Sequence, residues 1–220
     1  MIGAPREAEA GQQQGKEAMT GAADDIIALY RRQGPAWAAA RNRRLYERGW
    51  LDRFAALARP GATLLDIGCG AGDPIARYLR DKGHPVTGVD AAPEMLALFR
   101  ENLPDARAEQ ADMRGLDLGR AFGGLIAWDS FFHLAPGDQR GMFPVFRIHA
   151  EPGAPLLFTS GPSGGEAIGT LAGEPLYHAS LDPDEYRDIL DVNGFDVVDH
   201  VPEDPACTGH TVWLARRRGD

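Results

Sequence analysis

A short apolar run between two turn signals dominates the pattern of hydrophobic and polar positions. Residues 63–67 (Thr-Leu-Leu-Asp-Ile) follow a Pro-Gly pair and precede a glycine cluster, so they predict a buried β-strand. Three glycines stand at alternate positions after this strand: Gly68, Gly70 and Gly72. They permit a tight turn that a ligand can approach closely. Asp73 is a good N-cap and Pro74 suits a first helical position, which predicts a helix over residues 74–81.

Strands and helices alternate along the rest of the chain, which is typical of an α/β sheet. Further strands are predicted over residues 85–90, 107–111, 122–130, 155–159, 195–201 and 211–215, and further helices over 94–102, 137–150 and 185–192. Residues 160–178 are rich in glycine and predict a long loop. Glu203 and Asp204 predict an acidic loop, and residues 216–218 (Arg-Arg-Arg) a solvated tail.

The N-terminal part divides into two segments. Residues 1–22 contain few large apolar side chains and predict a flexible tail or a weak helix. Residues 23–58 carry the apolar spacing of amphipathic helices, interrupted at Gly34-Pro35. We therefore expect an N-terminal helical cap over 23–58, followed by the main domain over 59–217.

Composition narrows the possible classes of protein. The chain has 220 residues, of which 44% are apolar, enough for one α/β domain with a substantial core. Its net charge of −9 argues against nucleic-acid or anionic-membrane partners, which require a positive face. It has no apolar stretch of membrane-spanning length, no secretory signal pattern and only two cysteines, so a cytoplasmic location is expected.

The glycine turn also indicates the ligand. Free N–H groups at a helix start attract a carboxylate or a phosphate. The spacing Gly-x-Gly-x-Gly departs from the dinucleotide fingerprint, and Asp66 just before it would oppose a pyrophosphate but hold an ammonium group. About twenty residues further on, Asp90 ends the next strand, where a carboxylate accepts hydrogen bonds from ribose hydroxyls. Together these features favour an amino acid joined to a nucleoside.

From residue 55 to residue 216 the sequence resembles the class I S-adenosylmethionine (SAM)-dependent methyltransferases, whose first motif has the form of residues 64–74. The resemblance implies a Rossmann-like, mostly parallel seven-stranded sheet with helices on both faces and an antiparallel last strand. It also implies SAM as the cofactor and an N-terminal lid. The expected cofactor-binding residues are Asp66, Gly68, Gly70, Gly72, Asp90, Ala91, Met95, Asp112, Met113 and Trp128, with Tyr30, Trp37 and Arg41 from the lid. Alternatively, Tyr30 and Trp37 only pack against neighbouring side chains, and Arg41 lies on a solvated face.

The segment after the fourth strand is expected to face the transferred methyl group, because open parallel sheets bind ligands beyond their strand ends. His133 has the pKa range of a general base, and Asp129 would orient it or bind the substrate; a loop histidine without a catalytic role is the alternative. Phe132, Tyr177 and His178 are candidate substrate contacts. His210 stands at the start of the last strand, where a catalytic role is one interpretation and a plain strand start is the favoured one. The end of the fifth strand offers no metal ligand, so no metal is expected.

These features predict an enzyme that transfers a methyl group from SAM to an oxygen or nitrogen of a small molecule. The alternative is a SAM-binding regulator or partner subunit without catalysis. A dinucleotide oxidoreductase is disfavoured by the glycine spacing and by Asp66. The residues do not indicate the oligomeric state.

Overall fold

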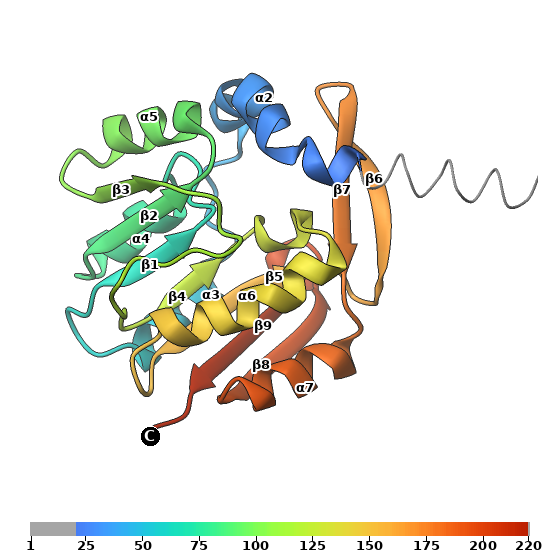
Figure 1. Cartoon of the computed structure of the whole chain (residues 1–220). Helices are drawn as coiled ribbons and strands as arrows, with labels where there is room; N and C mark the ends of the chain where they lie inside the picture. The colour runs from blue at the N-terminus through green and yellow to red at the C-terminus, as the bar shows by residue number, and fades with distance from the viewer. Residues whose placement is uncertain (1–20, 220) are drawn as a thin grey trace, which may run out of the picture.

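A seven-stranded sheet forms the centre of the computed structural model, which describes residues 21–219 (Figure 1). Its strands are β1 (Leu64–Ile67), β2 (Val86–Asp90), β3 (Arg107–Gln110), β4 (Leu125–Ala127), β5 (Pro155–Ser160), β8 (Phe195–Asp204) and β9 (His210–Arg217). They lie in the order β3-β2-β1-β4-β5-β9-β8, and β9 runs antiparallel to both of its neighbours. The predicted tail falls outside the described residues except for residues 21 and 22, which are helical.

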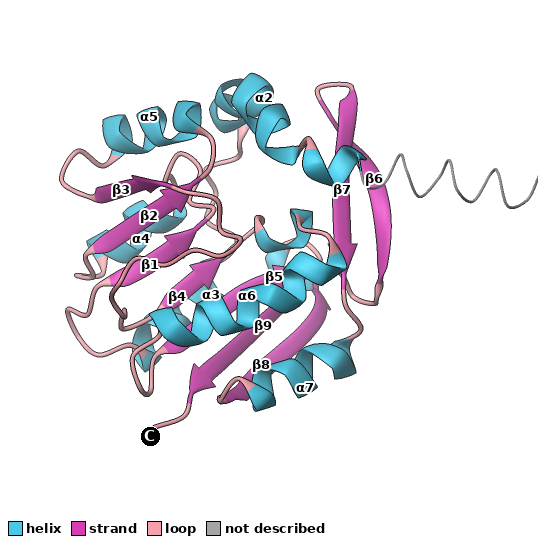
Figure 2. Cartoon of the chain, viewed as in Figure 1, coloured by secondary structure: helices cyan, strands magenta, loops and turns pink. Residues whose placement is uncertain are grey.

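Helices cover both faces of the sheet (Figure 2). They are α3 (Arg48–Leu57), α4 (Ile75–Asp81), α5 (Pro93–Asn102), α6 (Pro136–His149) and α7 (Pro183–Val192). Because successive strand residues point to opposite faces, Leu65 joins the core under α6 and α7, whereas Leu64 joins the core under α3, α4 and α5. β1 is buried along its whole length, as expected of a central parallel strand. The predicted Rossmann-like fold class is therefore confirmed.

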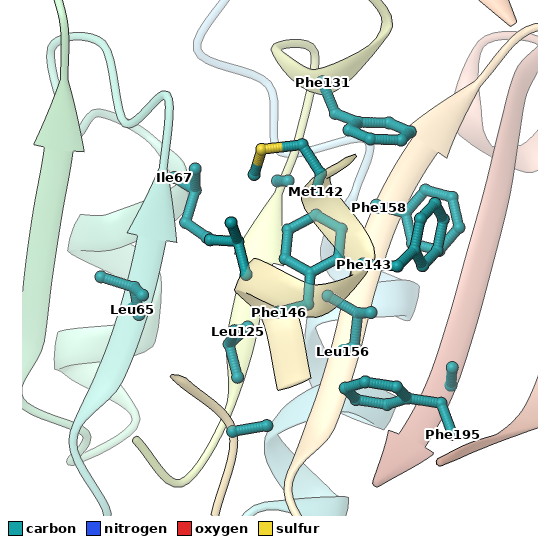
Figure 3. Packing of buried hydrophobic residues seen from close by; sticks show 14 of the residues in the cluster. Leu65, Ile67, Leu125, Phe131, Met142, Phe143, Phe146, Leu156, Phe158 and Phe195 are labelled. Carbon is teal, nitrogen blue, oxygen red and sulfur yellow. The ribbon is translucent and has the colours of Figure 1, made fainter. Parts of the chain in front are cut away.

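Aromatic side chains fill the core on the α6 face (Figure 3). Phe143 and Phe146 of α6 lie against Phe158 of β5, and all three are fully buried. Phe131, which belongs to the short 3-10 helix η1 (Phe131–His133), packs against the same cluster. This rigid packing fixes η1, and with it the segment that follows β4, at the carboxyl edge of the sheet.

The helix α2 (Ile26–Ala40) crosses above this edge, from α5 to the strand β7 (Glu174–Ser180) (Figure 1). The predicted interruption at Gly34-Pro35 is wrong, since α2 continues through both residues. Close packing explains the continuation: a Cβ on Gly34 would lie 2.5 Å from the sulfur of Met95, so the helix approaches α5 at that position. This tertiary contact outweighs the local helix-breaking tendency of proline.

The predicted loop over residues 160–178 is largely a β-hairpin, made of β6 (Gly165–Leu171) and β7. Its two-residue turn is Ala172-Gly173, and both residues have positive φ, at 51° and 85°. This is the backbone geometry of the turns that suit hairpins. The many glycines concealed the strand, because glycine is a poor strand former unless pairing compensates for it.

Several predicted boundaries are also corrected. The helix α4 begins at Ile75, whereas the sequence predicted a start at Pro74. Asp73 makes no capping hydrogen bond, and its carboxylate lies near Arg43 and Arg77 instead. β8 extends to Asp204 and takes in the predicted acidic loop, while β9 reaches residue 217. Arg218 is bonded to acidic side chains of α7 and β8, so residues 216–218 are not a free tail. The division into tail, cap and main domain stays a prediction.

Candidate active site

A pocket lies at the carboxyl edge of β1, β2 and β4, beneath α2, and contains about 1040 Å³ of space continuous with solvent. Ligand pockets in proteins have this order of size. Most of the predicted cofactor residues line it: Tyr30, Trp37, Arg41, Gly68, Gly70, Asp90, Ala91, Met95, Asp112, Met113 and Trp128. Asp129 and His133 also reach it. The fold thus brings together residues separated by up to 103 positions.

The glycine turn forms one wall. Gly68 and Cys69 donate their N–H groups to the carbonyl of Val89, which ties the turn to the end of β2. Gly68 has a φ of +75°, and a Cβ there would lie 2.3 Å from the side chain of Ser130. Gly72 is not among the lining residues; a Cβ at that position would meet Phe99 of α5. Gly72 therefore serves packing, contrary to its predicted contact with a cofactor.

Asp66 lies below the turn rather than in the pocket. It is 3% exposed and is not a lining residue, so the predicted direct grip on an ammonium group is not seen. Burial raises the pKa of its carboxyl to about 7, although the nearby charge of Arg41 acts in the opposite direction. Since a strand residue points to one face or the other, the tip of β1 directs this side chain into the protein.

Asp90 is held firmly at the tip of β2. One of its carboxylate oxygens accepts the N–H of Gly70 at 2.9 Å, and the other accepts the N–H of Ala92 at 2.9 Å. Burial raises the pKa of this carboxyl, while these backbone bonds oppose the shift. A carboxylate offers about four lone pairs, so two remain for hydroxyl groups of a ligand.

Asp112 and Met113 line the pocket beyond β3. Arg114 donates to the Asp112 carboxylate from its backbone and its guanidinium, at distances from 2.6 to 3.1 Å. Burial alone would raise the pKa of Asp112, but the hydrogen bonds from Arg114 lower it below its ordinary value. Contact between Asp112 and an adenine amino group would therefore share the carboxylate with Arg114.

The lid helix contributes Tyr30, Trp37 and Arg41. The Arg41 guanidinium lies 5.3 Å from the Trp37 ring centre and 3.1 Å from a carboxylate oxygen of Glu47. Outside the pocket, Arg32 and Gln33 of α2 donate to Glu174 at the tip of the hairpin, with closest distances of 2.6 and 2.7 Å. α2 is thus held from both sides while its inner face remains a wall of the pocket.

His133 is a neutral, buried ring. Its Nδ1 lies 2.7 Å from the carbonyl of Tyr177, which only accepts hydrogen bonds, so Nδ1 carries a proton. Its Nε2 lies 3.0 Å from the Tyr30 hydroxyl and accepts a hydrogen bond from it. Burial lowers the pKa of His133 to about 4, and the bond to Tyr177 opposes the shift. Both ring nitrogens are therefore already bonded.

A second histidine, His210, stands behind the pocket. Its Nε2 lies 3.0 Å from the Asp129 carboxylate, and its ring stacks on Trp128 with 5.5 Å between centres. The sequence favoured a plain strand start for His210 and left a catalytic role as the alternative. The antiparallel direction of β9 brings that first residue to the same edge as the ends of β1 and β4. The sequence placed His210 at the start of this strand but did not indicate its contact with Asp129.

The three predicted substrate contacts lie outside the pocket. Tyr177 is fully buried and donates its hydroxyl to Glu166 within the hairpin. Phe132 and His178 line a separate, shallow hollow beside the hairpin. Tyr177 and His178 are neighbours on β7, so their side chains point to opposite faces of the hairpin, while Phe132 belongs to η1. The lining residues that were not among the predicted site residues are Ala23, Asp24, Ile26, Ile27, Cys69, Val89, Ala92, Ala111, Arg114, Ser130, Leu134, Ala135 and Asp138.

Residues 64–153 match the protein family described as "Methyltransferase domain". A relative in Streptomyces venezuelae, dTDP-3-amino-3,4,6-trideoxy-alpha-D-glucopyranose N,N-dimethyltransferase, is 33% identical over 98 residues, which are 44% of this chain and 41% of that protein. The chain spans about two fifths of the length of the curated relatives it matches.

Two solved structures share the fold. The complex of DhpI with S-adenosylhomocysteine (SAH) has a TM-score of 0.71 at 18% identity, and the match covers 91% of this chain and 99% of that one. SAM-bound CalS10, an amino pentose methyltransferase from Micromonospora echinaspora, has a TM-score of 0.66 at 22% identity. This match covers 81% of this chain and 93% of that one. The match to the methyltransferase family thus covers residues 64–153, and the chain shares the Rossmann-like fold of these two structures. None of its described helices combines the length and the apolar character needed to span a bilayer.

Replacing Gly68 tests the close packing of the turn. We expect Gly68→Ala to lower the unfolding free energy by roughly 2–4 kcal/mol, because it adds a clash with Ser130 to the strain of a positive φ. Gly61→Ala is the matched control, since Gly61 has a φ of +72° but open space around its Cβ position. That control should lose only about 1–2 kcal/mol. Equal losses in urea denaturation would contradict the packing argument.

The buried carboxyl of Asp66 predicts a pH-dependent stability. Its folded-state pKa is raised above the unfolded value, so folding disfavours the charged form and stability falls as pH rises between about 4 and 7. Asp66→Asn removes this loss, and we expect it to stabilise the protein by roughly 1–4 kcal/mol at pH 8 but not at pH 4. Asp105→Asn, at a largely exposed carboxylate, is the control. A gain that is the same at both pH values would contradict the raised pKa.

Proposed function

We propose that this protein transfers a methyl group from SAM to an amino nitrogen of a small molecule. The observation that carries the proposal is one pocket that joins the glycine turn and Asp90 at one end to Asp129, Tyr30 and His133 at the other. The first group suits a nucleoside joined to an amino acid, and the second suits an acceptor whose proton must be removed. The methyltransferase family of residues 64–153 supports the same reaction.

The pocket residues fit SAM. Asp90 is rigidly held, borders the pocket and keeps lone pairs for ribose hydroxyls. Gly70 has a φ of +53° and no side chain, which leaves the backbone open to a ligand. Arg41 supplies a cation for a carboxylate, and Met95 an apolar surface. When bound, SAM supplies an electrophilic methyl group on a sulfonium sulfur.

An amine is the favoured acceptor. Asp24, Asp129 and Asp138 line the pocket and can accept hydrogen bonds from N–H groups. Aromatic rings of Tyr30, Trp37 and Trp128 border the same space and suit a group that carries partial positive charge. Two relatives are named N,N-dimethyltransferases of dTDP-linked amino sugars, which supports an amino sugar as the class of acceptor.

His133 and Tyr30 form the proposed path for the proton. Because Nε2 of His133 is bonded to the Tyr30 hydroxyl, His133 reaches an acceptor through that hydroxyl. The lone pair of the acceptor nitrogen would bond to the methyl carbon while the bond between that carbon and the sulfonium sulfur breaks, which leaves SAH. The N–H proton of the acceptor passes to the Tyr30 oxygen and the Tyr30 proton passes to Nε2 of His133. The number of protons is conserved, and the imidazolium then releases one to solvent. Exclusion of water by α2 favours the reaction of the amine over hydrolysis.

The role of Asp90 can be measured by the binding of SAH. We expect Asp90→Ala to weaken SAH binding by about 1–3 kcal/mol, or roughly 5- to 150-fold, because bonds to the ligand are lost. Calorimetric titration of the full chain measures this change. Asp105→Ala, which alters an exposed carboxylate far from the pocket, should bind SAH like the unmodified protein. Unchanged affinity of Asp90→Ala would remove Asp90 from the cofactor site.

Product mass tests the reaction itself. We expect the protein and SAM to add one or two methyl groups to a dTDP-linked 3-amino-6-deoxyglucose, and none to the matched 3-hydroxy sugar. His133→Ala should lower turnover about 10²- to 10⁴-fold and leave SAH affinity unchanged, if His133 accepts the proton. Methylation of the hydroxy sugar would overturn the choice of nitrogen. Tight SAH binding without transfer to any amine or hydroxyl would instead favour a non-catalytic SAM-binding protein.

A further inference from the structure

The sheet topology brings His210 to the wall where the acceptor would bind. β9 lies next to β5 and runs antiparallel to it, so the first residue of β9 stands at the carboxyl edge of the parallel strands. The short 3-10 helix η2 (Pro205–Cys207), followed by Thr208 with a φ of +54°, turns the chain into this strand. His210 thereby meets Asp129, which comes from the end of β4.

Oxygen atoms face both ring nitrogens of His210. Nε2 lies 3.0 Å from the Asp129 carboxylate, and Nδ1 lies 2.8 Å from the carbonyl of Cys207. An imidazolium suits both contacts: Nδ1–H donates to the carbonyl, and the ring pairs with a buried carboxylate oxygen that has no hydrogen-bond partner among the described residues. The Thr208 hydroxyl, 3.0 Å from Nδ1, can serve as a further acceptor.

The charges around His210 favour the same state. Its hydrogen bond with the Asp129 carboxylate, followed by the charge of that group, raises the pKa of the ring, while burial opposes the shift. Glu47, just before α3, adds a negative charge that acts in the same direction. Asp204 of β8 is its partner across the strand pair. The pKa of His210 is thus raised, whereas burial lowers the pKa of His133.

Asp129 is held through its backbone as well. Its φ is +49°, a left-handed conformation that a non-glycine residue adopts only when its surroundings impose it. Its N–H donates to the Thr159 hydroxyl of β5 at 2.9 Å. Asp129 borders the pocket, so a fixed main chain and an ion pair together set where its carboxylate meets a ligand.

We propose that His210 is a positioning residue, whose imidazolium holds the Asp129 carboxylate in one orientation and compensates its charge at the acceptor end of the pocket. This inference rests on the proposed transfer to an amine. An amine attacks only through an unshared electron pair, which the ammonium form lacks. A carboxylate that is already paired with a cation accepts an N–H bond without strongly stabilising the ammonium form. His210 therefore keeps the bound acceptor in its reactive state.

Ring titration tests the ion pair without any acceptor. Histidine ring nitrogens of the full-length ¹⁵N-labelled protein are followed by NMR from pH 5 to 9. We expect His210 to be doubly protonated at pH 7, and its proton affinity to fall tenfold or more in Asp129→Asn. His210→Asn identifies the resonance. A neutral ring at pH 7, or an equal titration in Asp129→Asn, would overturn the proposal.

The pH profile of transfer tests the positioning role. With the 3-amino sugar as acceptor, His210→Asn should shift the acidic limb of kcat/KM for the amine to higher pH by about one unit, since the uncompensated carboxylate stabilises the ammonium form. Thermal stability and SAH affinity should stay unchanged. His200→Asn, which alters a histidine on β8 outside the pocket, is the control.

The outcomes separate the two proposals. A pH profile of His210→Asn that superimposes on that of the unmodified protein would overturn the positioning role even if transfer occurs. If the unmodified protein methylates no amine, the proposed function fails and the acceptor role of His210 fails with it. The ring titration in that case still supports or overturns the ion pair between His210 and Asp129.

Discussion

The contact between the glycine turn and the tip of β2 is the constraint on which the site depends. Gly68 and Cys69 are bonded to the carbonyl of Val89, and Gly70 is bonded to the carboxylate of Asp90. This contact requires a left-handed backbone with no Cβ at the point where Ser130 approaches. It sets the floor of the pocket and the direction of Asp90 at once. A wider turn would separate two groups that must meet the same ligand.

Polar contacts join the edges of α2 to its neighbours. Arg32 and Gln33 connect α2 to the hairpin at Glu174, and Arg31 lies 3.5 Å from Glu94 of α5. Exposed pairs of this kind contribute little stability each, so apolar packing also holds α2: Leu29 is 1% exposed, and Gly34 lies against Met95 of α5.

Two histidines show how environment assigns chemistry to the same side chain. His133 is buried and faces one acceptor and one hydroxyl, so it stays neutral. His210 faces a carboxylate and a carbonyl, which favour a second proton on its ring. The two environments shift the pKa values of the two rings in opposite directions.

Local sequence determined the parts of this protein that depend on neighbouring residues: the buried strand, the glycine turn, Asp90 about twenty residues on, and the order of strands and helices. These follow from periodicity and backbone freedom, which act over a few positions. Tertiary structure decided the rest. It buried Asp66, carried α2 through Gly34-Pro35, paired the glycine-rich segment into a hairpin and brought His210 to Asp129. Those outcomes depend on strand direction and on packing between distant segments, which no local pattern contains.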